Sequence, residues 1–213
     1  MLELGIKTLL AYLLGSIVGS LVVGRLRGGV DIRTVGSGTA GGTNALRTQG
    51  KWFAFWVIVI DVGKGVLAAA VVPDLRLPGV PPDPQVSREW LTVACAGVAI
   101  IGHVYPVWYD FRGGKGAATL IGTLLGLQPA LLVPVLIVWF VTVALTGYVG
   151  LATMCASAAL PIYVCLTMVP PPVPLVTFTV GVALLVIFTH RSNLARMLRG
   201  NENRARRLWL LRR

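Results

Sequence analysis

The most informative residues of the chain are Gly-Gly-Lys-Gly at positions 113–116, which lie between two hydrophobic segments. A glycine-rich turn exposes backbone N–H groups, and the side chain of Lys115 adds a positive charge beside them. The turn differs from a Walker loop because Lys115 is not followed by Ser or Thr. We interpret it as a seat for a phosphate group at a membrane surface, formed by Gly113, Gly114, Lys115 and Gly116.

A second group of polar residues lies in segment 31–51, whose sequence is DIRTVGSGTAGGTNALRTQGK. Its glycines let the backbone approach a ligand, and Ser37, Thr43 and Asn44 provide hydroxyl and amide groups. Arg47 provides a forked cation that suits phosphate oxygens. A flexible loop between two helices has a similar content of Gly, Ser and Thr. The residues alone therefore leave a plain loop and a phosphate site equally open.

A third polar segment, 189–204, follows the last apolar stretch of the chain. A basic helix lying on anionic lipid would explain the arginines of residues 204–213. It would not explain His190, Asn193 or the Gly-Asn-Glu-Asn turn that contains Glu202. These residues therefore indicate a further role for the segment.

Three ionisable residues lie within or at the edge of apolar segments. Asp61 and Lys64 are three positions apart, so they can pair on one face of a helix. Ionisable residues inside a membrane are often functional, but a structural ion pair is an equal alternative here. His103 precedes the glycine turn, and an isolated histidine on an apolar face more often serves packing. We expect His103 mainly to orient the turn.

The composition indicates a membrane protein. Hydrophobic residues make up 55% of the chain and charged residues 13%, whereas soluble domains average roughly 25% charged residues. No weakly hydrophobic stretch is long enough for a separate globular unit, so we predict a single transmembrane domain over residues 1–213. The net charge of +11 then indicates basic residues at the cytoplasmic lipid face rather than a nucleic-acid partner.

Apolar segments of about 20 residues predict membrane-spanning helices. They cover residues 4–26, 52–72, 90–109, 129–148, 151–169 and 174–190, and a shorter apolar segment covers 117–127. Three clusters of basic residues, in segments 25–51, 112–115 and 191–213, share one face only if 117–127 also crosses. We therefore predict an all-α integral membrane protein, a bundle of about seven transmembrane helices. Its N-terminus lies outside, and its C-terminus and all three polar segments lie on the cytoplasmic face.

Together, the three polar segments resemble one family, the bacterial acyl-phosphate:glycerol-3-phosphate acyltransferases of the PlsY type. Residues 36–47, GSGTAGGTNALR, resemble the family's first motif, GSGNxGATNxxR. Residues 102–119 and 190–203 resemble its second and third motifs, GHxxPxxxxFxGGKGxAT and HxxNxxRxxxGxE. Thr39 stands where the family often has Asn, and Arg112 where it often has Lys.

The resemblance implies transfer of a fatty acyl group from acyl phosphate to the 1-hydroxyl of glycerol 3-phosphate, giving lysophosphatidic acid and phosphate. It also implies a bacterial plasma membrane location with a cytoplasmic active face, membrane lipid as surroundings, and no metal or cofactor. The implied catalytic residues are Ser37, Lys115, His190 and Asn193. The implied substrate- and phosphate-binding residues are Thr43, Asn44, Arg47, Lys64, His103, Gly113, Gly114, Gly116 and Glu202.

Two questions stay open at this point. The proton of the attacking hydroxyl can go to His103, to His190 or to a phosphate oxygen of a substrate. A transporter of an anionic solute would also place polar residues in a helical bundle, although it usually holds them near the midplane in paired repeats. A membrane scaffold with a basic tail would leave the glycine-rich segments unexplained.

Overall fold

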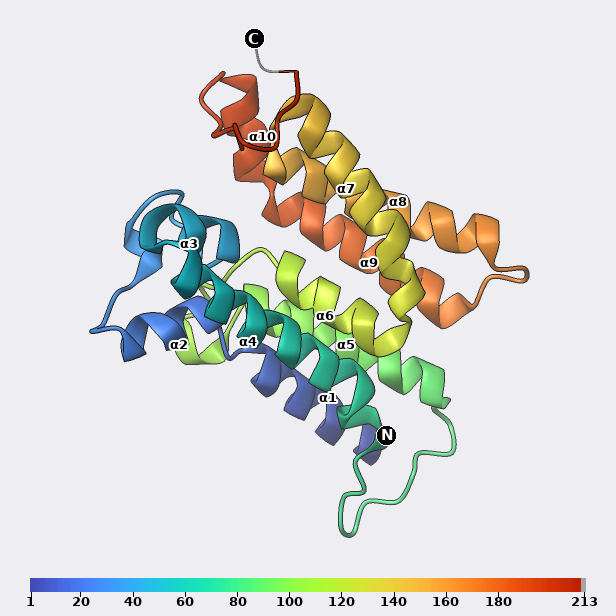
Figure 1. Ribbon diagram of the computed structural model, residues 1–213. Helices are drawn as coiled ribbons and strands as arrows, with labels where there is room; N and C mark the ends of the chain where they lie inside the picture. The colour runs from blue at the N-terminus through green and yellow to red at the C-terminus, as the bar shows by residue number, and fades with distance from the viewer. Residues whose placement is uncertain (212–213) are drawn as a thin grey trace. The chain divides into compact units, whose positions relative to one another are not determined.

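The computed structural model describes residues 1–211, which form α-helices, short 3-10 helices and loops, with no strand in that range (Figure 1). The chain divides into two compact units, Met1–Gln128 and Pro129–Arg213. The α-helices of the first unit are α1 (Leu2–Gly15), α2 (Gly19–Leu26), α3 (Gly42–Gln49), α4 (Lys51–Ala70), α5 (Arg88–Val104) and α6 (Ala117–Leu127). Those of the second unit are α7 (Leu132–Thr146), α8 (Val149–Thr167), α9 (Val173–Thr189) and α10 (Arg191–Leu198). The single transmembrane domain stays a prediction.

Within residues 1–211, four helical segments are long and apolar enough to cross a membrane. They are Lys51–Asp74, Arg88–Tyr109, Pro129–Thr146 and Val149–Thr167. Two bent helix pairs, α1 with α2 and α9 with α10, raise the number to six if each pair is one span. The short helix α6 has the bounds of the predicted apolar segment 117–127. The number seven and the orientation of the termini stay predictions.

The first apolar segment, expected as one span over residues 4–26, forms two helices. α1 ends at Gly15, α2 begins at Gly19, and the two are bent by 48°. Such a break leaves C=O groups of α1 and N–H groups of α2 without partners in their own helices. Inside a bilayer these groups must be satisfied by other parts of the protein. The break therefore requires polar side chains from a neighbouring helix.

Glycines bring the helices of the first unit into close contact. α1 packs on α5, and α4 packs on α6 (Figure 1). A Cβ atom at Gly102 of α5 would lie 2.4 Å from the carbonyl oxygen of Tyr12 in α1. One at Gly122 of α6 would lie 2.0 Å from the carbonyl oxygen of Val62 in α4. Helices with small residues at the contact approach closely. Since α4 also contacts α1 and α5, polar residues of all three helices can meet inside the unit.

The start of α1 and the proline-rich loop lie at the end of the first unit away from α3 (Figure 1). A buried ion pair that the sequence did not reveal holds this end. The Lys7 ammonium donates to the Glu3 carboxylate at 2.7 Å and to the carbonyl oxygen of Pro73 at 2.6 Å. The Arg88 guanidinium donates to the same carboxylate at 2.7 Å, and the backbone N–H of Asp83 donates to it at 2.8 Å. This carboxylate therefore ties the proline-rich loop to the starts of α1 and α5.

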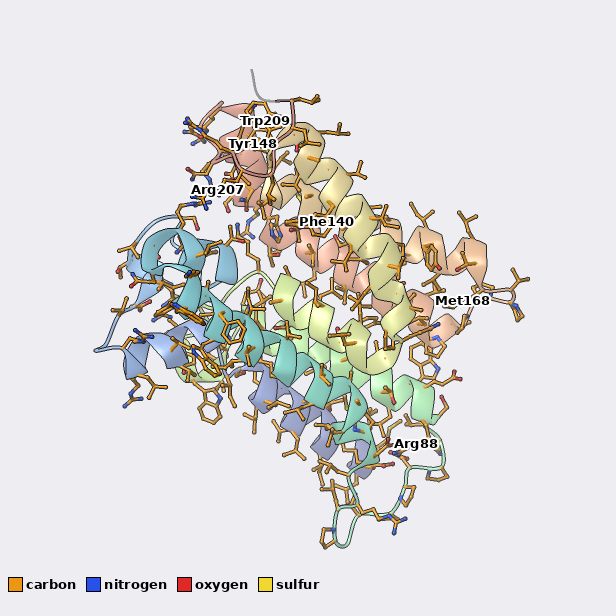
Figure 2. The ribbon with its side chains drawn as sticks, in the orientation of Figure 1. Arg88, Phe140, Tyr148, Met168, Arg207 and Trp209 are labelled. Atoms are coloured by element: carbon orange, nitrogen blue, oxygen red, sulfur yellow. The ribbon has the colours of Figure 1, made fainter. Side chains whose placement is uncertain are left out.

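In the second unit, α8 packs against both α7 and α9, and the tail after α10 lies on the turn between α7 and α8. The backbone N–H of Ala205 donates to the carbonyl of Gly147 at 2.7 Å. The Arg204 guanidinium lies 4.6 Å from the ring centroid of Tyr148 and 4.2 Å from that of Trp209, the two rings labelled together in Figure 2. Arg204 thus has an intramolecular role beyond the expected lipid contact, whereas Arg212 and Arg213 lie outside the described residues.

The contact between α4 and α6 can be tested with two glycines. Gly122→Ala is expected to lower the melting temperature of the purified protein in detergent, because its Cβ would collide with the backbone of Val62. Overpacking of this kind costs about 1–3 kcal/mol. Gly63→Ala is the matched control, since a Cβ at Gly63 of α4 would have no neighbour within 4 Å. Equal melting of both variants would contradict the close contact.

Candidate functional site

The break in the first span is satisfied by Asp61 and Lys64 of α4. The Lys64 ammonium donates to the carbonyl oxygens of Gly15 and Ile17, at 2.8 and 2.7 Å. The Asp61 carboxylate accepts the backbone N–H of Gly19 at 3.0 Å. The cation therefore lies at the C-terminal end of α1 and the anion at the N-terminal end of α2, which is the favourable arrangement for both helix dipoles.

Asp61 and Lys64 also form the predicted ion pair, with 3.0 Å between Nζ and Oδ1 and with both side chains almost fully buried. The sequence left a structural and a functional role open for this pair. The structure places the pair at the break and adds a third member, His103 of α5. His103 Nδ1 lies 2.8 Å from Lys64 Nζ and 3.3 Å from Asp61 Oδ1.

The His103 ring is fixed by two charged neighbours. Its Nδ1 faces the Lys64 ammonium, which only donates hydrogen bonds, and the Asp61 carboxylate, which only accepts them, so these contacts fix the position of the ring without assigning its tautomer. The ring is 2% exposed, and its Nε2 side faces the glycine turn. A Cβ atom at Gly114 would lie 2.2 Å from Nε2 and 2.9 Å from the carbonyl oxygen of Ala40 in the first loop. His103 therefore packs against the turn, and its orienting role stays a prediction.

The first two glycines of the turn are used differently from the expected exposed N–H groups. The N–H of Gly113 donates to the carbonyl of Val104, and the N–H of Gly114 donates to the carbonyl of His103, both at 3.1 Å. These two bonds satisfy carbonyls at the C-terminal end of α5. A Cβ atom at Gly113 would lie 2.0 Å from the carbonyl oxygen of His103. The glycines thus allow the turn to lie directly on α5.

Lys115 and Gly116 lead into α6. Gly116 is the residue before the helix and has a left-handed backbone, with φ of 90°, which glycine adopts without strain. The first intrahelical bond there runs from the Leu120 N–H to the Gly116 carbonyl. The N–H groups of residues 117–119 therefore lack partners within the helix, and such a helix start favours an anion. The partly exposed Lys115 adds its positive charge at this same end.

The first loop is organised around Asn44, which lies on α3 and is 2% exposed. Its side-chain oxygen accepts the N–H of Ser37 at 2.9 Å. Its side-chain nitrogen lies 2.9, 3.0 and 3.1 Å from the carbonyl oxygens of Ile32, Val35 and Thr39. Every hydrogen-bonding atom of this side chain is thus engaged with the loop. We propose that Asn44 shapes the loop instead of contacting phosphate.

The remaining polar residues of this loop are accessible. Thr43 and Arg47 are exposed and lie four positions apart, so they share one face of α3. The Ser37 hydroxyl is half-buried and lies 2.7 Å from the Thr39 hydroxyl. Thr39 stands at the departure from the family motif, and its hydroxyl occupies the hydrogen-bonding position next to Ser37. These side chains keep their predicted roles as phosphate partners.

Arg33, which the sequence suggested only as a basic residue, joins the two loops of the first unit. Its guanidinium holds the Asp31 carboxylate with contacts of 2.8 and 3.0 Å. It also donates to the carbonyl oxygens of Tyr109 and Arg112, both at 3.1 Å. The hydrogen bonds from Arg33 lower the pKa of Asp31. The pair's contribution to stability is therefore present above about pH 4, the ordinary pKa of aspartate, and is lost as the pH falls through the lowered pKa.

The third polar segment forms a cluster in the second unit. The Glu202 carboxylate accepts the Asn193 amide at 2.7 Å and the Arg196 guanidinium at 2.6 Å. Gly200, with φ of 73°, turns the chain back after α10 and so places the carboxylate there. A Cβ atom at Gly150 of α8 would lie 2.8 Å from Asn193 Cγ, so this glycine makes room for the amide. Glu202 thus orients Asn193.

His190 lies between α9 and α10 and is 6% exposed. Its Nδ1 lies 2.8 Å from the carbonyl oxygen of Val186. A carbonyl only accepts hydrogen bonds, so Nδ1 donates and Nε2 carries the lone pair. The ring is therefore held in the tautomer that a base or a hydrogen-bond acceptor requires.

The predicted site residues therefore fall into two groups, one in each unit. The first unit holds Ser37, Thr43, Asn44, Arg47, Lys64, His103, Gly113, Gly114, Lys115 and Gly116. The second unit holds His190, Asn193 and Glu202. Sequence reasoning missed the bridging role of Arg33, whose only signal was an aspartate two positions earlier in the same loop.

Comparison with known sequences gives consistent matches. Residues 6–200 match the family model described as glycerol-3-phosphate acyltransferase. A glycerol-3-phosphate acyltransferase of Rhodospirillum rubrum is 38% identical over 205 residues, which cover 95% of this chain and 91% of the relative. The protein of that name in Synechococcus elongatus is 39% identical over 197 residues, covering 92% and 91%. One from Coxiella burnetii is 35% identical, covering 94% and 97%.

Solved structures are similar as well. One is a crystal structure of PlsY, an integral membrane glycerol 3-phosphate acyltransferase, in its glycerol 3-phosphate form. Its TM-score is 0.79 at 30% identity, and the match covers 94% of each chain. The lysophosphatidic acid form gives a TM-score of 0.78 at 29% identity, covering 96% of this chain and 97% of the other. The predicted class, an all-α multi-pass membrane protein, is thereby confirmed.

The role of Asn44 gives a prediction on stability. Asn44→Ala should lower the melting temperature in detergent, because it leaves the partly buried N–H of Ser37 without its partner and removes one hydrogen bond from each of three loop carbonyls. An unsatisfied buried group typically costs about 1–3 kcal/mol. Thr43→Ala is the control, since Thr43 is an exposed neighbour on α3. An Asn44→Ala protein that melts like the wild type would show that the loop does not depend on this amide.

Proposed function

This chain belongs to the glycerol-3-phosphate acyltransferase family, and from that premise we propose that it acylates the 1-hydroxyl of glycerol 3-phosphate. The proposed donor is acyl phosphate, and the products are lysophosphatidic acid and inorganic phosphate, an early step of phospholipid biosynthesis. The observation that supports the proposal most strongly is the family match over residues 6–200, which includes the first two polar segments and most of the third. The resemblance stated from the motifs is confirmed by this match.

The geometry of the first unit supports binding of phosphorylated substrates. Lys115 lies two residues before the first residue of α6, a helix start whose N–H groups favour an anion and to which the lysine adds a positive charge. Arg47 and Thr43 present a forked cation and a hydroxyl from α3. Ser37 lies in the loop before α3 and is fixed through its backbone N–H by Asn44. Both substrates carry phosphate, so cationic and N–H groups suit each of them.

The proposed reaction is one acyl transfer. The hydroxyl oxygen of glycerol 3-phosphate attacks the carbonyl carbon of the mixed anhydride, a new ester C–O bond forms, and the bond between that carbon and the phosphate oxygen breaks. Phosphate leaves with the bonding electron pair, and the hydroxyl proton is transferred to a base. Because the donor is already activated, positioning and charge stabilisation by Lys115 and its neighbours account for much of the rate.

The surroundings of the two histidines narrow the choice of base. Both ring nitrogens of His103 face protein groups, Nδ1 beside Lys64 and Asp61 and Nε2 against Gly114. His190 has its lone pair on Nε2. We therefore propose that the proton goes to His190 or to a phosphate oxygen of a substrate, and that Asn193 acts beside His190. Mutation of His190 separates these two routes.

Donor choice is the direct test of the proposed function. Purified protein should release one phosphate per acyl group transferred when it is given long-chain acyl phosphate and glycerol 3-phosphate. Acyl-CoA should give little or no product, because the three polar segments are short and suit two phosphates better than a nucleotide with a long pantetheine arm. Added EDTA should leave the rate unchanged. The measurements are phosphate release and mass-spectrometric detection of lysophosphatidic acid.

Lys115→Ala is the matched variant for this assay. Removal of one charge-stabilising group typically costs ~10²–10³-fold in rate, and the side chain is partly exposed, so melting should change little. Strong product formation from acyl-CoA alone would overturn the proposed donor. Failure with both donors, together with uptake of an anionic solute into proteoliposomes, would identify a transporter.

We further propose a location in the bacterial plasma membrane with the polar loops facing the cytoplasm. In a background without native cysteines, single cysteines at exposed cytoplasmic positions should resist an impermeant thiol reagent in intact cells, and a cysteine in the external loop should react. The cytoplasmic variants are Gln49→Cys, Arg112→Cys and Asn201→Cys, and the external one is Pro81→Cys. Labelling of position 201 without position 49 would contradict an even number of crossings between them.

A further inference from the structure

The cluster of Asp61, Lys64 and His103 joins two places that are distant along the chain. At one side it satisfies the broken first span through Gly15, Ile17 and Gly19. At the other side the imidazole of His103 contacts the glycine turn. The three side chains come from two helices, and each is at most 3% exposed. The cluster is therefore a rigid connection between the break and the turn that leads to Lys115.

Stability alone does not explain this cluster. Replacement of a buried ion pair by apolar residues is often neutral or stabilising. The second carboxylate oxygen of Asp61, Oδ2, is moreover buried without a hydrogen-bond partner among the described residues. Such an atom weakens the net stabilisation that the pair provides. The geometry is better explained by a need to hold His103 in one orientation.

We propose that Asp61, Lys64 and His103 form one positioning unit, in which the ring of His103 fixes the distance between the glycine turn and the first loop. The contact point is Gly114, which lies between the ring and the Ala40 carbonyl. Lys64 fixes the ring by its bond to Nδ1, and Asp61 fixes Lys64. The three residues act through Lys115 and do not themselves contact substrate. This inference rests on the proposed acyl transfer.

If the positioning unit is correct, the effect of a substitution at Gly114 depends on whether the ring of His103 is present. Gly114→Ala should reduce kcat/KM by about 10²-fold, the loss that a misplacement of roughly 1 Å produces, because the methyl group meets both Nε2 and the Ala40 carbonyl. His103→Asn retains an acceptor for Lys64 but removes the far side of the ring. Its melting should stay near that of the wild type, while its kcat/KM falls because the turn loses its support.

The test is a double-mutant cycle on kcat/KM for acyl transfer in the full-length protein. If the ring fixes the turn, kcat/KM of the double variant Gly114→Ala, His103→Asn should not fall below that of the less active single variant. The reason is that the methyl group at position 114 then occupies the space that the ring has left. Gly63→Ala combined with His103→Asn is the control and should be additive. Melting is measured in parallel for every variant, so that loss of fold is separated from loss of position.

Two results would overturn the positioning unit while leaving the proposed function intact. One is strict additivity of the kcat/KM losses caused by His103→Asn and Gly114→Ala, measured in variants that retain activity. The other is a His103→Asn protein with wild-type kcat/KM, since the ring would then have no effect on Lys115. A wild-type protein that shows no acyl transfer under any donor would instead contradict the proposed function itself.

Discussion

The arrangement of the first unit depends on the need to satisfy a broken helix inside a membrane. The gap between α1 and α2 leaves carbonyl and N–H groups that water cannot reach in a bilayer. Asp61 and Lys64 of α4 meet this need with one cation and one anion, each at the helix end that favours its sign. The same two side chains also hold His103, which packs against the glycine turn. The contacts that satisfy the break therefore also position the turn.

The contact of Asp61 and Lys64 with His103 requires that the helices approach one another closely. The Lys64 ammonium reaches α1 and α5 because glycines at the interfaces let the backbones touch, as at Gly15 against Ala99 and at Gly102 against Tyr12. A larger residue at either position would separate α1 from α5 and move the break away from His103. The buried charges therefore depend on the small residues, because the charged side chains reach their partners only at this helix spacing.

The sequence predicted those features that depend on local spacing. The apolar segment 117–127 is α6 with the same bounds, and the interval between Asp61 and Lys64 predicted their ion pair. Features that depend on partners distant in the chain were not predictable. The glycines at 113 and 114 indicated a close approach to the backbone, but composition does not reveal that α5 rather than a phosphate approaches them. Asn44 has the same chemistry whether it binds a loop or a ligand.

The difference between features set by local spacing and features set by distant partners also explains how the site is built. A mixed anhydride already carries a good leaving group, so a protein that uses it needs fixed charges more than a strong nucleophile. Fixed charges require a backbone that does not move, and the first unit provides one through Asn44, Arg33 and His103. Each of these side chains contacts the loops, whereas Lys115, Arg47 and Ser37 stay the proposed phosphate partners. We therefore propose that the motif residues divide into those that hold the loops and those that meet phosphate, although the sequence shows them as one continuous pattern.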